Sequence, residues 1–296
     1  MIKKIPLLVF IFFSIHLSSQ EEDLLSLLGE EEITDYTTAS FKTNRVINLH
    51  SLENVAAGVF DFKISHRFGF INGGIQELFG LDESSIRIGG DYGISDRLMV
   101  GFGRSSFEKT YDVFAKYKFL RQSKGKVNMP LTAAIFASAA IKTVPFANPE
   151  RENYFSSRLY YTYQLILGRK FSESFTLQLS PTVVHRNLVA TKLEKNDVYG
   201  MGTAARLKLT KRTTLNAEYV YLLPNQVALN IKNSLSIGFD IETGGHVFQL
   251  HFSNSTSMIE KGFVTETVGD WLDGDIHFGF NISRVFTLKD KRKKEE

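Results

Sequence analysis

Residues 275–288 read DIHFGFNISRVFTL, and this stretch decides the fold. From Ile276 to Ile282 the apolar residues occupy alternate positions, and the residues between them are polar or glycine. Because neighbouring side chains of a β-strand point to opposite faces, the stretch has one apolar face and one polar face. This pattern is typical of a strand that separates lipid from a watery lumen. The sequence therefore predicts a transmembrane β-strand here.

The same two-residue period recurs along the chain and predicts an all-β fold. The expected strands are residues 57–68, 84–94, 97–107, 110–121, 130–143, 156–170, 174–187, 197–209, 213–223, 233–242, 246–255 and 275–287. Most have the roughly 9–11 residues that a tilted membrane-spanning strand needs. We expect a single-chain antiparallel transmembrane β-barrel of about twelve strands, within a range of about 10–14. The alanine-rich segment 130–143 is the weakest of the twelve, because both of its faces are apolar.

The links between these strands differ in length. Short links, rich in Gly, Asp and Ser, are expected at 95–96, 173–174, 211–212 and 244–245. Long links are expected at 69–83, 144–155, 188–196 and 256–274. Short turns at one end and long loops at the other are typical of an outer-membrane barrel. The pattern fails near 108–110, where two short links follow each other and indicate a shifted strand boundary.

The two ends of the chain have a different composition. Residues 1–20 combine a positive start, a short apolar core and small residues before a cleavage site, which predicts a signal peptide. Residues 21–56 form an acidic, leucine-containing arm, interpreted as a short helix, an extended segment or a plug. The barrel is expected over 57–288, and residues 289–296 form a polar tail. With 296 residues, a net charge of +3 and no cysteine, the chain shows no sign of nucleic-acid binding, disulfides or thiolate metal sites.

Charged and polar residues fall on the inferred inner faces of the strands. The candidate lumen-lining residues are Lys63, Arg67, Arg87, Asp91, Lys116, Arg158, Arg206, Glu218, Asp240, Glu242, His251 and His277. They suit a charged field that steers solutes through a pore. They suit equally well an ion-pair network that fills the lumen. The apolar loop 256–274, with Phe263 and Trp271, is a candidate gate that folds into the lumen or packs on the rim.

Catalytic and metal-binding readings have weaker support. His251, His277 and the acidic residues of the inner face lack a short metal-ligand spacing, so we assign no metal and no cofactor. A hydrolase hypothesis rests on Ser and His residues two apart on one strand, such as His251 and Ser253. The sequence has no Gly-x-Ser-x-Gly motif, so no catalytic residue is assigned and we expect no enzyme.

Three blocks carry a resemblance to a known family. They are Arg45 to Asn48 with Asp61 to Gly69, then Glu242 to His251, then Gly274 to Phe286. In this order they resemble an uncharacterised family of Gram-negative outer-membrane β-barrels, known as a domain of unknown function. The resemblance covers about residues 40–288 and implies a fold and a location. It brings no substrate and no catalytic residue.

These observations leave several functional hypotheses open. The first is a passive outer-membrane channel or transporter for small solutes. The alternative is a structural or partner-binding barrel with a plugged lumen in an envelope complex. A soluble secreted β-protein and an outer-membrane hydrolase are the remaining options. The expected location is the outer membrane after export, with lipid and the barrel-assembly machinery, which would recognise the C-terminal strand, as partners.

Overall fold

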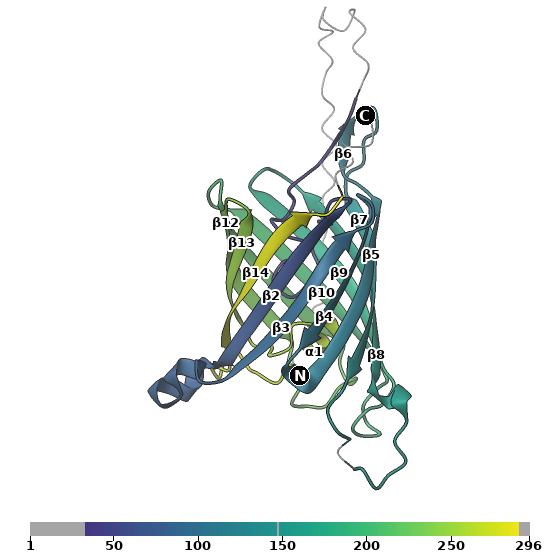
Figure 1. Cartoon of the computed structure of the whole chain (residues 1–296), viewed down its shortest axis with the longest axis vertical. Coiled ribbons are helices and arrows are strands. Elements are labelled where there is room, and N and C mark those ends of the chain that lie inside the picture. Colours follow the sequence, from purple (N-terminus) through teal and green to yellow (C-terminus); the bar gives the residue numbers. More distant parts are fainter. Residues whose placement is uncertain (1–32, 147, 290–296) are drawn as a thin grey trace, which may run out of the picture. The chain divides into compact units, whose positions relative to one another are not determined.

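Twelve antiparallel strands close into one barrel in the described part of the chain (Figure 1). The computed structural model describes residues 33–146 and 148–289, and the barrel belongs to the compact unit that begins at Thr34. The predicted signal peptide and nearly all of the predicted tail lie outside these residues.

Each strand of the barrel pairs with the next one along the chain. The strands are β2 (Val59–Phe70), β3 (Ser84–Gly93), β4 (Leu98–Ser105), β5 (Thr110–Leu120), β7 (Thr132–Lys142), β8 (Leu159–Lys170), β9 (Phe175–Arg186), β10 (Asp197–Lys208), β11 (Thr213–Leu222), β12 (Ser234–Thr243), β13 (His246–Ser253) and β14 (His277–Thr287). The ring closes between β14 and β2, where Ile282 lies opposite Ile64 and Phe280 opposite His66. The predicted fold class and the twelve expected segments are therefore confirmed. Residues 275–288 contain β14, the strand that closes the ring.

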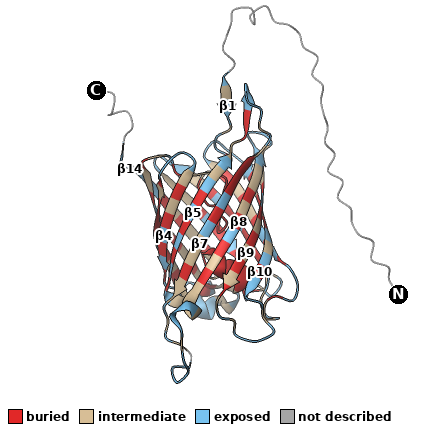
Figure 2. Cartoon of the chain, turned by 90° about the vertical axis from the view of Figure 1, so that its right-hand side faces the viewer, coloured by how far each residue is buried: buried red, intermediate tan, exposed pale blue. Residues whose placement is uncertain are grey.

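Buried and exposed residues alternate along the strands (Figure 2). On the outer surface, large apolar side chains such as Phe102, Tyr163 and Phe252 are exposed. Residues of the opposite parity point inward and are buried, as Thr162, Gln164 and Ile166 are in β8. A barrel with an apolar outer band and a buried interior has the surface that a lipid bilayer requires.

The two ends of the barrel carry different links. One end, called the short-turn end, has the tight links 94–97, 171–174, 209–212 and 244–245. The other, called the long-loop end, has 71–83, 143–158, 187–196, 223–233 and 254–276. The short link at 106–109 belongs to the long-loop end, and the longer link 121–131 belongs to the short-turn end. The predicted shift of a strand boundary near 108–110 is therefore wrong, because two atypical links produce the irregular spacing.

In the described residues, four short helices and one small ribbon accompany the barrel. The helices are η2 (Ile71–Gly80), η3 (Phe107–Lys109), η4 (Phe155–Arg158) and α1 (Glu260–Thr265). In the link 121–131, β6 (Ser123–Gly125) pairs with β1 (Thr34–Tyr36) to form a two-stranded ribbon outside the barrel. No helix of the described chain is long and apolar enough to cross a membrane.

Candidate functional site

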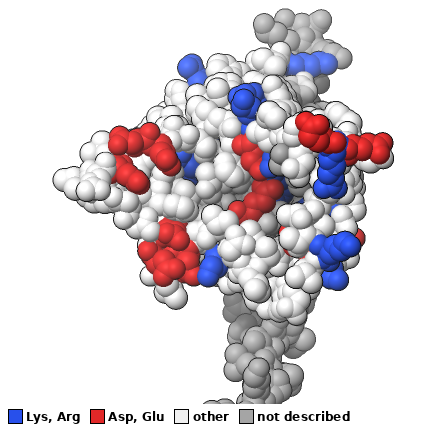
Figure 3. Space-filling model, turned by 90° about the horizontal axis from the view of Figure 1, so that it is seen from below, with Lys and Arg blue, Asp and Glu red and all other residues white. Residues whose placement is uncertain are grey.

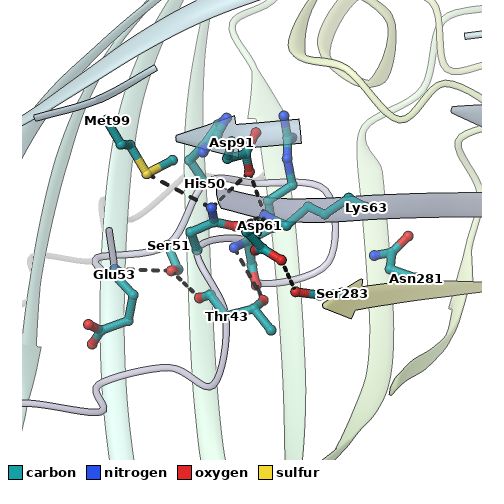
Figure 4. A network of polar contacts seen from close by, with 12 residues as sticks. Thr43, His50, Ser51, Glu53, Asp61, Lys63, Asp91, Met99, Asn281 and Ser283 are labelled. Carbon is teal, nitrogen blue, oxygen red and sulfur yellow. Dashed lines mark hydrogen bonds and ion pairs between the residues drawn. The ribbon is translucent and has the colours of Figure 1, made fainter. Parts of the chain in front are cut away.

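The chain that precedes β2 folds into the interior of the barrel. Residues 39–56, here called the lumen hairpin, run inward and return, and an isolated bridge joins Arg45 to His50. At its tip Val46 N donates to Leu49 O over 2.8 Å. Side chains of β2, β3, β5 and β9 to β14 bind the hairpin. Because these contacts come from around the closed ring, the hairpin occupies the lumen (Figure 4).

Glu218 of β11 binds the tip of the hairpin through its carboxylate. Asn48 N donates to Oε1 over 2.9 Å, and Leu49 N and Ile47 N donate to Oε2 over 3.0 and 3.2 Å. Three successive backbone N–H groups that point at one oxyanion form an anion-binding nest. In this barrel the anion belongs to the wall, so the nest attaches the hairpin to β11.

The carbonyl groups of the tip also have partners on the wall. Gln249 Nε2 donates to Val46 O over 2.9 Å, and Asn281 Nδ2 donates to Ile47 O over 3.2 Å. A turn enclosed in protein must have its backbone groups paired, because water does not reach them. The wall of the barrel supplies these partners, so the turn is stable at this depth.

Basic side chains of the wall bind the two arms of the hairpin. Lys116 Nζ donates to Ser51 O over 2.9 Å and also to Glu53 O. Arg67 Nη2 donates to Asn48 Oδ1 over 2.7 Å. Lys63 binds Asn44 and lies 2.6 Å from Asp91 and 3.2 Å from Asp61 (Figure 4). Lys63 is therefore ion-paired inside the barrel, and Lys116 and Arg67 are hydrogen-bonded to uncharged oxygens there.

An apolar cluster also holds the hairpin in the lumen. Hairpin residues Phe41, Val46, Leu49, Leu52 and Val55 are at most 6% exposed. They pack in one cluster with wall residues Met99, Phe114, Phe136, Ile166, Val184 and Val220. At about 1.5–3 kcal/mol for each large apolar side chain, the five hairpin residues contribute roughly 7–15 kcal/mol, an upper bound. This packing explains why the segment 130–143 has two apolar faces, one toward lipid and one toward the hairpin.

A second segment enters the lumen from the long-loop end. Residues 257–265, which include α1, are buried, and Phe263 and Val264 join the apolar cluster of the hairpin. Glu260 Oε1 lies 3.1 Å from Arg45 Nη1 and 3.5 Å from His50 Nε2. The two inserted segments therefore enter from opposite ends and meet inside the barrel.

Lys261 fixes α1 to η3 at the long-loop end. Its ammonium lies 2.8 Å from both carboxylate oxygens of Glu266 and contacts Glu108. Burial by itself would lower the pKa of Lys261, but the carboxylates of Glu266 and Glu108 raise it. Burial by itself would raise the pKa of Glu108, but Lys261 and Lys142 lower it. For Glu266 burial prevails and its pKa is raised.

The predicted gate loop divides into two parts. Phe263 is 1% exposed and lies in the lumen. Trp271 is only half-buried, and its Nε1 donates to Leu235 O over 2.9 Å. The part of the loop around Phe263 therefore enters the lumen, and the part around Trp271 packs on the rim. Each of the two predicted placements holds for one part of the loop.

Most of the predicted lumen-lining residues are buried. These are Lys63, Arg67, Arg87, Asp91, Lys116, Arg206, Glu218, Asp240, His251 and His277. Glu242 instead lies at the short-turn end, where its side chain is 50% exposed and pairs with Lys42, because β12 ends at Thr243. Arg158 lies in η4 and donates to Lys142 O and Val144 O, because β8 begins one residue later. Both residues have the inward parity but stand beyond the enclosed part of the lumen.

The histidines do not form the clusters that the sequence left open. Among the described residues, no three His, Asp or Glu side chains converge as a metal site would require. His251 is packed against the wall, where a Cβ on Gly279 would come within 2.6 Å of its Nε2. His277 instead interacts with Thr256 Oγ1 at 2.9 Å and Phe68 O at 2.7 Å.

Sequence reasoning missed how the interior is filled. A plug is one interpretation of the predicted arm 21–56, and residues 39–56 of it fill the lumen, but nothing in the sequence predicts their contacts with Glu218, Gln249 and Asn281. Residues 21–32 of the arm lie outside the described residues. A signal was present in Phe136 and Ile166, two large apolar residues at inward positions. A water-filled lumen does not favour such residues, so they indicate an internal occupant.

Two cavities of the described structure lie at opposite ends of the barrel. The first, about 500 Å³, lies between the hairpin and the wall and is lined by Lys42, Asn44, Asp61, Glu242 and Val285. The second, also about 500 Å³, lies at the long-loop end and is lined by Phe70, Ser85, Phe107, Thr256 and His277. The hairpin tip and α1 lie between the two ends.

Solved structures with similar architecture are membrane barrels. The NanC porin is 8% identical, covers 77% of this chain and 98% of its own, and has a TM-score of 0.48. An outer membrane channel from Pseudomonas putida F1 is 13% identical over 80% and 98% of the two chains, with a TM-score of 0.45. For outer membrane phospholipase A from Escherichia coli the values are 9%, 81%, 95% and 0.43. No curated protein sequence matches the chain.

The family is shown by a match along most of the chain. A family model described as "Membrane bound beta barrel domain (DUF5777)" matches residues 41–286, from the lumen hairpin to the end of β14. The resemblance inferred from the three sequence blocks is thereby confirmed. The chain belongs to this family of membrane-bound β-barrel domains of unknown function.

Proposed function

We propose that this protein is an outer-membrane barrel that is closed at rest and that serves as a membrane anchor for an envelope partner. The observation that carries the proposal is the lumen hairpin, which is hydrogen-bonded by side chains from nine strands of the wall and packs against an apolar cluster inside the barrel. A passive channel needs a continuous watery path. The filled lumen therefore favours the plugged-barrel hypothesis over an open channel.

The outer-membrane location is supported by the family and by the arrangement of the links. An even number of antiparallel strands, with short turns at one end and long loops at the other, is typical of bacterial outer-membrane barrels. Both Gly58 and Lys289, which flank the barrel in sequence, lie at the short-turn end and contact each other. We therefore assign the short-turn end to the periplasm and the long-loop end to the cell exterior.

The short-turn end offers a surface for a partner. The ribbon of β1 and β6 stands outside the barrel there, and the Arg121 guanidinium lies 4.1 Å from the centre of the Tyr36 ring. This ribbon is continuous with the lumen hairpin through residues 37–39. A partner that binds the ribbon would act directly on the segment that closes the barrel.

We propose that β14, with the exposed residues Val285 and Phe286, is the strand that the barrel-assembly machinery recognises. We assign no enzymatic activity. His185 pairs with Asp197 at 2.7 Å and with Asn187 at 2.9 Å, and no Ser hydroxyl is among its partners.

A gated channel is the second candidate. It is favoured by the cavities of about 500 Å³ at the two ends and by the polar contacts of the hairpin tip. A tip bound by Glu218, Gln249 and Asn281 can exchange these partners for water when it leaves. The small-solute transport hypothesis is retained in this gated form.

Single-channel recording of the reconstituted protein tests both candidates. We expect the native protein to insert, as judged by heat-modifiable migration on a gel, and to show no steady conductance. A reproducible open conductance of the native protein would overturn the closed-barrel proposal. Openings that appear only when the binding of the hairpin tip is weakened, as in Glu218→Gln, would favour the gated channel over the membrane anchor.

A further inference from the structure

The link between β2 and β3 forms an apolar projection at the long-loop end. Residues 71–83, here called the β2–β3 foot, include η2 and extend sideways from the barrel wall (Figure 1). Its large apolar side chains are exposed, with Ile75 at 80%, Phe79 at 55%, Leu78 at 52% and Leu81 at 45%. Apolar residues gathered in this way on a single projection indicate a contact surface.

The backbone of the foot holds these side chains in an uncommon conformation. Leu78 and Phe79 have φ values of 45° and 54°, in the left-handed region that bulky residues rarely adopt. Such a residue costs about 1–2 kcal/mol, so the surrounding structure must hold it in place. The exposure of the two side chains is therefore built into the foot.

Three contacts fix the base of the foot to the barrel. Gly69 N donates to Glu83 O over 3.0 Å, and Ile71 N donates to Ile276 O over 2.9 Å. Gly80 has a φ of 84°, and a Cβ there would come within 2.5 Å of Gly69 O. The base of the foot is thus attached to β2 and to the end of the link 254–276.

We propose that the β2–β3 foot lies in the membrane interface, with Ile75, Leu78, Phe79 and Leu81 at the boundary between headgroups and acyl chains. The foot continues the lipid-facing row of β2, which runs through Phe62, Ile64 and His66 to Phe68 and Phe70 at the base of the foot. The surface is therefore continuous with the lipid contact of a membrane-bound barrel. Interfacial segments bind through the apolar area that they bury.

The charges of the foot fit lipid better than a steered protein partner. Residues 71–83 contain the acidic Glu77, Asp82 and Glu83 and no Lys or Arg. Seen from the long-loop end, the tip of the projection is uncharged and the acidic groups lie behind it (Figure 3). Binding of the foot should therefore be apolar and almost independent of ionic strength. Naming the leaflet as the outer one rests on the proposed orientation, but the contact with lipid does not.

Spin labels test this contact, because the chain has no cysteine of its own. Ile75→Cys and Phe79→Cys would carry a nitroxide, and Leu229→Cys and Leu272→Cys would be matched controls in loops of the same end. Leu229 and Leu272 are 100% and 96% exposed. The labelled barrels are inserted into phosphatidylcholine vesicles, and collisions with oxygen and with a water-soluble nickel chelate are measured.

We expect labels at 75 and 79 to lose most of their collisions with the nickel chelate and to keep those with oxygen, at low and high salt alike. Labels at 229 and 272 should collide freely with the chelate. Equal chelate collisions at all four positions would overturn the proposal. Shielding of 75 and 79 from both reagents would also overturn it, because that pattern indicates protein contact.

A second measurement covers the case in which a labelled variant folds poorly. Trp271 is the single tryptophan, so Trp271→Phe combined with Phe79→Trp places the only indole on the foot. Lipids brominated on the acyl chain should quench this indole, and the matched Trp271→Phe, Leu229→Trp variant should be unaffected. Absence of quenching in a barrel that shows heat-modifiable migration overturns the foot proposal alone. Failure of the barrel to insert at all would count against the proposed function instead.

Discussion

Replacing Glu218 tests whether the nest holds the lumen hairpin in place. In Glu218→Gln one carboxylate oxygen becomes an NH₂ group, so at least one of the three N–H groups of Ile47, Asn48 and Leu49 loses its acceptor. A hydrogen bond to a charged group contributes about 1.5–3 kcal/mol, and a neutral one about 0.5–1.5 kcal/mol. Removing a buried charge offsets part of the loss. We therefore expect the closed hairpin to lose about 2–3 kcal/mol relative to its open form.

Hydrogen exchange of the same three amides measures this loss directly. At about 1.4 kcal/mol per factor of ten, 2–3 kcal/mol corresponds to exchange that is roughly 30- to 150-fold faster, provided that the hairpin opens locally. Asp112→Asn is the matched control. Asp112 is a buried lumen acid that pairs with Arg87 and has no hydrogen bond to the hairpin.

The comparison between the two variants decides the outcome. In Asp112→Asn, residues 47–49 should exchange as in the native protein, even if strand amides near Arg87 change. If exchange at 47–49 stays within about twofold of the native rate in Glu218→Gln, the nest does not hold the hairpin. Other contacts would then have to keep the hairpin in the lumen, contrary to the role assigned to Glu218.

Two further changes test the apolar cluster and the fixing of α1. Phe136→Ala should lower the free energy of unfolding by about 3–5 kcal/mol in urea titrations, because Phe136 packs against the hairpin and is only 2% exposed. Ile135→Ala, on the lipid-facing side of the same strand, should lower it by less. Burial lowers the pKa of Lys261, but Glu266 and Glu108 raise it above the ordinary value of 10.5. The stabilising contribution of Lys261 is therefore present below pH 10.5 and is lost as the pH rises through the pKa of the folded state. Fluorescence of Trp271, which lies in the same loop, should therefore change at that alkaline step, and the step should be absent from Lys261→Met.

The strands and their order could be predicted from the sequence. Each strand has one face toward lipid, so the two-residue period is present locally in every segment, as in Phe278 and Phe280 of residues 275–288. Consecutive strands joined by short links then pair in sequence order. The atypical links at 106–109 and 121–131 obscured only the assignment of links to ends.

The candidate site was less predictable. Inward residues such as Lys116 and Arg67 were identified by parity, but parity gives a direction and not a partner. Glu242 and Arg158 have the correct parity and still stand outside the enclosed lumen, because a strand end fixes depth and the period does not. Glu218 appeared as one acid among several, and nothing local marked it as the residue that binds the hairpin.

A barrel of about twelve strands is predictable from the order of the residues, because contact with lipid imposes a repeating pattern on every strand. The filling of the lumen is visible only in the folded chain. The hairpin has no period of its own, and its partners Glu218, Gln249 and Asn281 lie about 170 to 230 residues further along the chain. These residues surround the tip of the lumen hairpin only when β2 pairs with β14 and the ring closes.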